Sequence, residues 1–159
     1  MSNEIVKKLN FGDEGKNKVF QGVSKLTKAV SSTLGASGKC VMLEDSSGKP
    51  LITKDGVTVA NSVTLLDPVE NMGATLLKEA ARQTVKEAGD GTTTATVLAH
   101  SILKEAFETK DYNSREVRDG ISSAVEKVVA YLESKAVDVS GDMLKQVATI
   151  SSNNDSDLG

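Results

Sequence analysis

Residues 88–99 read Ala-Gly-Asp-Gly-Thr-Thr-Thr-Ala-Thr-Val-Leu-Ala and lie between two segments with apolar residues at helical spacing. Gly89 follows the last periodic residue of the first segment, where a left-handed residue commonly ends a helix. Thr92, Thr93 and Thr94 come directly before the next apolar run, so they are expected at the start of a second helix. The stretch therefore predicts a helix, a glycine-rich turn and the N-terminus of another helix.

The same stretch has the chemistry of a phosphate site. The free N–H groups and the dipole at a helix N-terminus favour negative charge, and the threonine hydroxyls surround them. Asp90 would repel a phosphate unless a divalent cation lay between them, and a carboxylate beside hydroxyl and phosphate oxygens suits Mg²⁺. A glycine-rich turn before a threonine-capped helix explains these residues equally well. Both interpretations stay open on the residues alone.

A long helix is predicted to begin after Asp67 and to end at Gly89. Asp67 can cap the free N–H groups, Pro68 suits the first helical position, and Glu70 completes a spacing like that of a capping box. Apolar and small residues then recur at steps of four, which predicts a broad buried stripe. Its members are Met72, Leu76, Ala80, Thr84 and Ala88, with Val69, Leu77 and Ala81 beside them.

The other periodic segments predict a mainly α fold with one small β-hairpin. An apolar stripe over residues 13–34 indicates a first helix. Two short apolar runs, 41–43 and 51–53, flank a polar Gly/Pro segment and indicate the hairpin. Further helices are expected over 92–107, from Asn113 to Leu132, and over 140–147. The stripe of the first helix consists of Val19, Val23, Leu26, Val30 and Leu34.

Two loops are candidates for the rest of a phosphate site. Residues 33–38, Thr-Leu-Gly-Ala-Ser-Gly, close the first helix, and residues 53–56, Thr-Lys-Asp-Gly, end the hairpin. If these loops converge with residues 88–99, they supply a backbone cradle, a cation in Lys54, and a carboxylate in Asp55 that is free to orient water. Each loop alone is a weak signal, since Thr-Lys-Asp-Gly is also an ordinary turn.

Several other classes of protein are excluded or disfavoured. A P-loop does not fit, because only two residues separate Gly35 from Gly38, and Lys39 is followed by Cys40 instead of Ser or Thr. The 159 residues include 19 Lys+Arg and 22 Asp+Glu, so the formal charge of −3 disfavours nucleic acid as a partner. No apolar run approaches the ~18 residues that cross a bilayer, so no membrane partner is expected. One cysteine and an N-terminus without an apolar leader favour the cytoplasm.

The motifs taken together resemble a group I chaperonin of the GroEL type. They are Thr-Leu-Gly-x-x-Gly, Thr-Lys-Asp-Gly-Val, Glu-Asn-Met-Gly-Ala, the 88–99 stretch and Thr-Ile-Ser, and the match runs from Phe11 to Gly159. The resemblance implies a multihelical bundle like a chaperonin equatorial domain. Residues 1–136 would be the N-terminal half of that ATP-binding domain, and 137–159 the start of the intermediate domain. The apical domain and the returning segments of such a subunit are absent from these 159 residues.

The resemblance also implies an ATP site with Mg²⁺ and K⁺. Asp90 would be the Mg²⁺ ligand and Asp55 the catalytic carboxylate, while main-chain oxygens near Thr33 and Lys54 would hold K⁺. The chain has Ala36 where the family usually has proline, and Ser37 where it usually has lysine, which implies looser nucleotide binding. The implied nucleotide-binding residues are Thr33, Leu34, Gly35, Ala36, Lys54, Asp90, Gly91, Thr92, Thr93, Thr94, Ile150 and Ser151.

The function implied is that of an ATP-dependent protein-folding chaperone subunit. Like subunits would form a ring, and unfolded client proteins and a co-chaperonin would bind through the apical domain. The full subunit would be an ATPase, whereas turnover by the 159-residue chain stays open. The alternative is a truncated, non-catalytic paralogue that joins or modulates a chaperonin ring.

Overall fold

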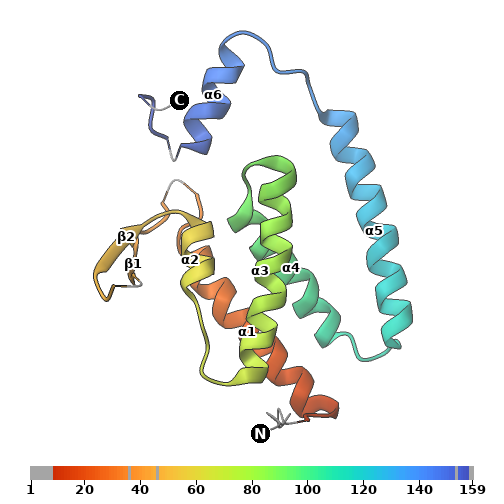
Figure 1. The fold of residues 1–159 in the computed structure, drawn as a ribbon. Helices are drawn as coiled ribbons and strands as arrows, with labels where there is room; N and C mark the ends of the chain where they lie inside the picture. Colours follow the sequence, from red (N-terminus) through yellow and green to blue (C-terminus); the bar gives the residue numbers. More distant parts are fainter. Residues whose placement is uncertain (1–8, 36, 46, 153, 158–159) are drawn as a thin grey trace, which may run out of the picture. The chain divides into compact units, whose positions relative to one another are not determined.

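The computed structural model describes residues 9–35, 37–45, 47–152 and 154–157 (Figure 1). Within them the chain is mainly helical with one two-stranded antiparallel sheet, as predicted. The elements in chain order are α1 (Gly12–Ser31), β1 (Val41–Glu44), β2 (Pro50–Thr53), α2 (Gly56–Ser62), α3 (Pro68–Ala88), α4 (Thr92–Glu108), α5 (Ser114–Lys135) and α6 (Asp142–Ser151).

The chain forms two compact units, Met1–His100 and Ser101–Gly159, which divide within α4. The first unit contains the two strands, the first three helices and the start of α4. The second contains the rest of α4 with α5 and α6. The predicted boundary between an equatorial and an intermediate domain at 136/137 concerns membership of larger domains and stays a prediction.

The core of the first unit lies where α1 meets α2 and α3. Val23, Leu26 and Val30 are buried on α1, which confirms the centre of its predicted stripe, whereas Leu34 lies beyond the helix and is exposed. From α2 come Val59 and Ala60, and from α3 come Ala74 and Leu77. The hairpin adds Val41 and Leu43, partly buried against this cluster.

The predicted buried stripe of α3 is wrong in its centre. Met72 and Leu76 are 59% and 63% exposed, while the buried residues of α3 are Gly73, Ala74, Leu77 and Ala81. A helix has 3.6 residues per turn, so steps of four drift by roughly 40° each and leave any one face after a few steps. Leu77 and Ala81, which were predicted beside these residues, are buried as expected, and the small residues Gly73 and Ala74 complete the contact face.

Two glycines explain why the small-residue face is buried. A Cβ added at Gly22 of α1 would overlap the backbone of Glu70, and a Cβ added at Gly73 of α3 would overlap the backbone of Val19. The two helices therefore cross with their backbones in direct contact. On either side of the crossing, Lys18 pairs with Asp67 at 3.0 Å and Lys25 with Glu70 at 2.5 Å.

The helix ends follow the local sequence closely. Asp67 caps α3 through hydrogen bonds from the N–H groups of Val69 and Glu70, and Gly89 ends it with φ of 76°. Asn113 caps α5 in a capping box with Glu116. The capping box suggested for Glu70 at α3 does not form, since its carboxylate pairs with Lys25 instead.

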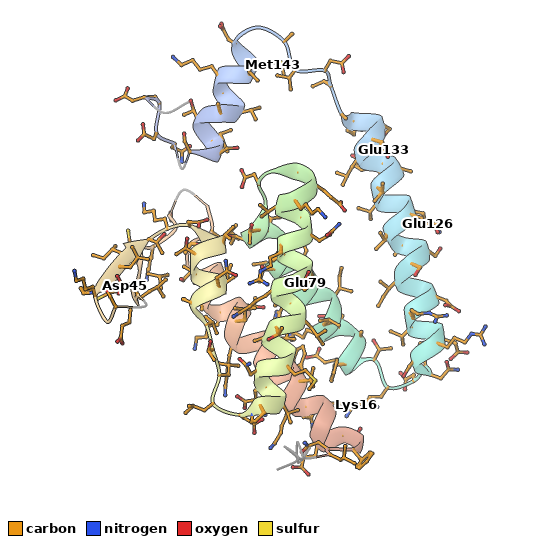
Figure 2. The ribbon with its side chains drawn as sticks, viewed as in Figure 1. Lys16, Asp45, Glu79, Glu126, Glu133 and Met143 are labelled. Carbon is orange, nitrogen blue, oxygen red and sulfur yellow. The ribbon has the colours of Figure 1, made fainter. Side chains whose placement is uncertain are left out.

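The second unit consists of amphipathic helices without a buried core of their own. No described residue of α5 or α6 is buried. Figure 2 shows side chains projecting from α5 around Glu126 and Glu133. α6 begins at Asp142 and continues to Ser151, later at both ends than the predicted 140–147. Over the described part of the chain, no helix combines the length and apolar character that a membrane crossing requires.

Candidate nucleotide site

Three segments that are distant in the sequence meet at one end of the first unit. Thr33 follows the C-terminus of α1, Gly56 opens α2, and Thr93 lies in the first turn of α4. The hydroxyls of Thr33 and Thr93 are 3.5 Å apart, and a Cβ added at Gly56 would overlap Oγ1 of Thr93. In Figure 1 this is the end of the unit at which α3 finishes. The predicted convergence of the three loops is therefore present within the first unit.

The loop after α1 is closed by its own backbone. The N–H of Gly38 donates to the carbonyl of Gly35 at 2.9 Å, and that of Lys39 to Ser32 at 2.8 Å. Gly35 has φ of +75°, a conformation that favours glycine. Thr33 is 7% exposed, and its hydroxyl donates to the carbonyl of Val30 at 2.8 Å. Leu34 and Gly35 lie on the surface, whereas the predicted Ala36 lies outside the described residues.

The N-terminus of α4 presents free N–H groups, as the sequence predicted. The first bond of the helix runs from the N–H of Ala95 to the carbonyl of Gly91 at 2.8 Å. The N–H groups of Thr92, Thr93 and Thr94 therefore have no acceptor within the helix. Together with the helix dipole they favour a bound anion.

The three threonines differ in their surroundings. Thr92 is 7% exposed, and its carbonyl accepts a hydrogen bond from the hydroxyl of Thr96 at 2.8 Å. Thr93 is half-buried against Thr33 and Gly56. Thr94 is exposed. The hydroxyl of Thr93 thus joins the α1 loop to α4, and this contact makes the predicted convergence of the two segments.

Asp90 lies in the exposed turn directly before α4. One carboxylate oxygen, Oδ1, accepts a hydrogen bond from the N–H of Gly91 at 2.6 Å, and Gly91 has φ of +91°. No described residue donates to the other oxygen, so Oδ2 is available as a metal ligand. The described residues contain no group of three or more His, Cys, Asp or Glu side chains placed to hold a metal. A Mg²⁺ at Asp90 would therefore take most of its ligands from phosphate and water, a donor set that suits this hard cation.

Asp55 occupies a position different from the one expected. The sequence suggested a carboxylate free to orient water, but Asp55 is the N-cap of α2. Its Oδ1 accepts from the N–H of Val57 at 3.1 Å, and its Oδ2 accepts from the N–H and the hydroxyl of Thr58 at 2.9 and 2.5 Å. Burial alone would raise the pKa of Asp55, but the hydrogen bonds from Thr58 and Val57 outweigh it and lower the pKa below its ordinary value. The carboxylate is therefore ionised and fixed, with lone-pair capacity left for one further donor.

Thr58 is a site residue that the sequence analysis missed. A short helix over 56–62 was not predicted, because seven residues give too little periodicity to recognise. The spacing Asp-x-x-Thr from Asp55 to Thr58, with Gly56 at the first helical position, was the available signal for a capped helix start.

Lys54 supplies a cation beside the capped helix. It is exposed, and no described carboxylate forms an ion pair with its ammonium group. Nor does any described residue donate a hydrogen bond to the carbonyl oxygens of Thr33 or Lys54. Main-chain oxygens of this kind suit K⁺ as well as water, so the residues present fit the implied monovalent ion.

Ile150 and Ser151 belong to the second unit. They form the C-terminal end of α6, and Ile150 is 68% exposed. Their part in a nucleotide pocket stays a prediction.

The comparisons with known proteins agree on a single family. A family model described as the TCP-1/cpn60 chaperonin family matches residues 26–158. The protein "Heat shock protein 60, mitochondrial" of Ajellomyces capsulatus is 49% identical over 156 residues, which are 96% of this chain and 26% of that protein. The chain thus spans about a quarter of the length of this relative.

Solved structures give the same result. The crystal structure of the chaperonin gp146 from the Pseudomonas aeruginosa bacteriophage EL, in the presence of ATP-BeFx, matches with a TM-score of 0.79 and 36% identity. That match covers 91% of this chain and 26% of the phage chain. A group III chaperonin in the open state matches with a TM-score of 0.75 and 29% identity, over 90% of this chain and 29% of that one. The chain belongs to the TCP-1/cpn60 chaperonin family.

Proposed function

We propose that this chain is the ATP-binding part of a chaperonin subunit and that it binds Mg²⁺-ATP where α1, α2 and α4 meet. The observation that carries the proposal is the contact of Thr33 and Gly56 with Thr93. It joins a glycine loop, a capped carboxylate and a free helix N-terminus in one place. The phage chaperonin, 36% identical, was crystallised in the presence of ATP-BeFx, which supports a nucleotide as the ligand.

Each group at the site has a distinct role in binding. The N–H groups of Thr92, Thr93 and Thr94 would donate hydrogen bonds to phosphate oxygens, and the ammonium of Lys54 would balance the phosphate charge. Asp90 would hold Mg²⁺ together with those oxygens, and the carbonyls of Thr33 and Lys54 would hold K⁺. The metal ions supply charge neutralisation at the phosphates.

Asp55 would orient the attacking water. Its low pKa makes it a weak proton acceptor, and its hydrogen bonds hold it in one place. It therefore positions a water by accepting one hydrogen bond, so that the water oxygen faces the terminal phosphorus. The bond from that phosphorus to the leaving ADP oxygen would break as the new bond to water forms, and the water would pass its proton to an oxygen of the transferred phosphate.

The activity of a complete subunit is part of the same proposal. ATP turnover would drive the folding of client proteins in a ring of like subunits, with clients and a co-chaperonin bound by segments outside this chain. We also propose a cytoplasmic location. One relative carries the word mitochondrial in its name, so fractionation of the source cells tests this point directly.

The binding proposal is tested by calorimetric titration of the purified protein with Mg²⁺-ATP. Asp90→Asn removes one charge from the site, and Glu87→Gln makes the same charge change in the last turn of α3. We expect Asp90→Asn to weaken Mg²⁺-ATP by about tenfold or more, since it loses a charge-assisted contact of roughly 1.5–3 kcal/mol. Glu87→Gln should bind like the wild type. Equal affinities of all three proteins, or no binding by the wild type, would contradict the proposal.

A further inference from the structure

The proposed water-orienting carboxylate, Asp55, lies at the N-terminal end of α2. Side chains of α3 hold the C-terminal end of the same helix. Asp55 caps its first turn, and Val63 follows its last residue. Between them, Val59 and Ala60 are buried in the core of the first unit. The last turn of α2 contains no basic residue of its own. Its terminal carbonyl groups therefore depend on another element for their partners.

Two cations of α3 reach this C-terminal end. The Lys78 ammonium donates to the carbonyl of Val63, in a short hydrogen bond, and to that of Asn61 at 3.5 Å. Arg82, one turn further along α3, donates from Nη2 to Oδ1 of Asn61 at 2.7 Å and also lies 3.7 Å from Glu79, which Figure 2 labels on α3. Cations at a helix C-terminus also interact favourably with its dipole. We call these four residues, Lys78, Arg82, Asn61 and Val63, the α2 clamp.

Lys78 holds the end of α2 more firmly than Arg82 does. Burial against α2 lowers the pKa of the Lys78 ammonium, and the nearby charge of Arg82 lowers it further. Such an ammonium has exchanged part of its hydration for carbonyl oxygens. The Arg82 side chain is 56% exposed, so its bond to Asn61 competes with water.

We propose that Lys78, assisted by Arg82, is a positioning residue for ATP hydrolysis: it fixes the far end of α2 and so keeps Asp55 and Gly56 in place beside Thr93. This inference rests on the proposed function. A seven-residue helix is about 10 Å long and rigid, so a tilt that displaces Val63 at one end also displaces Asp55 at the other. The phosphate-binding N–H groups lie on α4 and not on α2, so they depend less on the clamp than Asp55 does. Loss of the clamp should therefore reduce turnover more than affinity.

The experiment compares Lys78→Met with Lys86→Met in steady-state ATP hydrolysis by the purified protein. Lys78→Met keeps an unbranched stem and removes the ammonium, while Lys86, exposed in the last turn of α3, gives the same charge change outside the clamp. We expect kcat of Lys78→Met to fall about tenfold with KM for ATP within about twofold, because small displacements of a positioned group are costly. Lys86→Met should match the wild type, and Lys78→Arg should recover most of kcat.

Amide hydrogen exchange separates positioning from a general loss of stability. The N–H groups of Val57 and Thr58, bonded to Asp55 at the end opposite the clamp, should exchange faster in Lys78→Met. Amides of α1 should keep their rates. Arg82→Met is the second variant, with the same pattern and a smaller effect, should Lys78→Met fail to fold.

Each remaining outcome overturns the inference. Unchanged kcat and unchanged α2 exchange in an active protein would reject the clamp and leave the proposed function standing. A fall in affinity equal to the fall in turnover, or faster exchange throughout the first unit, would make Lys78 merely structural. Wild-type protein that binds Mg²⁺-ATP without hydrolysing it would reject the catalytic roles of Lys78 and Asp55 while keeping the binding site. No binding at all would reject the proposed function itself.

Discussion

At the scale of single residues, the site depends on a close backbone approach and a fixed carboxylate. Gly56 leaves room for the hydroxyl of Thr93, and Asp55 directly before it is held by three hydrogen bonds. A carboxylate with this many donors is a rigid acceptor with a lowered pKa. Position and ionisation at Asp55 therefore have the same cause, which is the capping of α2.

Substitution of Gly56 should disturb the contact between α2 and Thr93 of α4. In Gly56→Ala the added methyl would overlap Oγ1 of Thr93, so either α2 or α4 must shift. We expect a loss of about 1–3 kcal/mol in the free energy of unfolding and weaker Mg²⁺-ATP binding. Gly120→Ala in α5 is the control, because nothing lies within 4 Å of its added Cβ. Chemical denaturation and calorimetry measure both quantities, and a Gly56→Ala protein as stable as Gly120→Ala would refute the close contact.

The capping aspartates should make stability depend on acid pH. The Lys18 ammonium and the N–H groups of Glu70 and Val69 lower the pKa of Asp67, and Thr58 and Val57 lower that of Asp55 against the effect of burial. Groups with a lowered folded pKa stabilise the protein above their unfolded pKa, near 3.9, and lose that contribution as the pH falls through the folded value.

Thermal unfolding between pH 6 and pH 2.5 measures this effect. We expect the midpoint to fall with acid in the wild type and to fall less steeply in Asp55→Asn and Asp67→Asn, which do not titrate. Asp138→Asn, a carboxylate for which no partner appears in the described part of the chain, should retain the wild-type slope. Identical slopes in all four proteins would show that folding does not lower the pKa values of Asp55 and Asp67.

At the scale of elements, the crossing of α1 and α3 organises the first unit. Gly22 and Gly73 bring the two backbones together, and the core residues of α2 then fill the space beside the crossing. The α2 clamp attaches the last turn of α2 to α3. The helix that carries Asp55 is thus held through α3 and, through the crossing, by α1.

The crossing should tolerate no side chain larger than hydrogen. Gly73→Ala would place a methyl group in the backbone of Val19, and relief requires the helices to separate. We expect a loss of at least about 1–3 kcal/mol in the free energy of unfolding, the usual range for overpacking. Ala80→Ser, on the exposed face of the same helix, should change it by less than about 0.5 kcal/mol. A Gly73→Ala protein of wild-type stability would mean that the helices are further apart than described.

At the scale of the whole molecule, the second unit exposes apolar side chains along its longest helix. Val125, Val128 and Leu132 of α5 are 45%, 56% and 59% exposed and share one side of the helix. Apolar patches of this kind favour association. We expect the isolated 159-residue chain to self-associate in light scattering.

A variant with Val128→Lys and Leu132→Lys should shift this equilibrium toward the monomer. Ser122→Lys with Ser123→Lys adds the same charge to α5 at polar positions and should leave the association unchanged. A monodisperse wild-type monomer would contradict this prediction.

Much of the fold could be predicted because the deciding signals are local. The caps at Asp67, Gly89 and Asn113 are single residues whose preferred conformations end or begin helices in any surroundings. The hairpin followed from its turn and the two apolar runs. Leu77 and Ala81 of α3 are buried as predicted, but the rest of that buried face could not be predicted, because Gly73 is buried through a contact with α1 that no local pattern encodes.

The sequence by itself determined where α3 begins and ends, where α5 begins and which helix start leaves its N–H groups free, since backbone conformation and capping depend on neighbours a few residues away. Only the tertiary structure decided that Thr93 contacts Thr33 and Gly56, and that Lys78 holds the C-terminal end of α2. These contacts join residues between 15 and 60 positions apart. Their cause is the packing of helices around a shared core, which no single segment specifies.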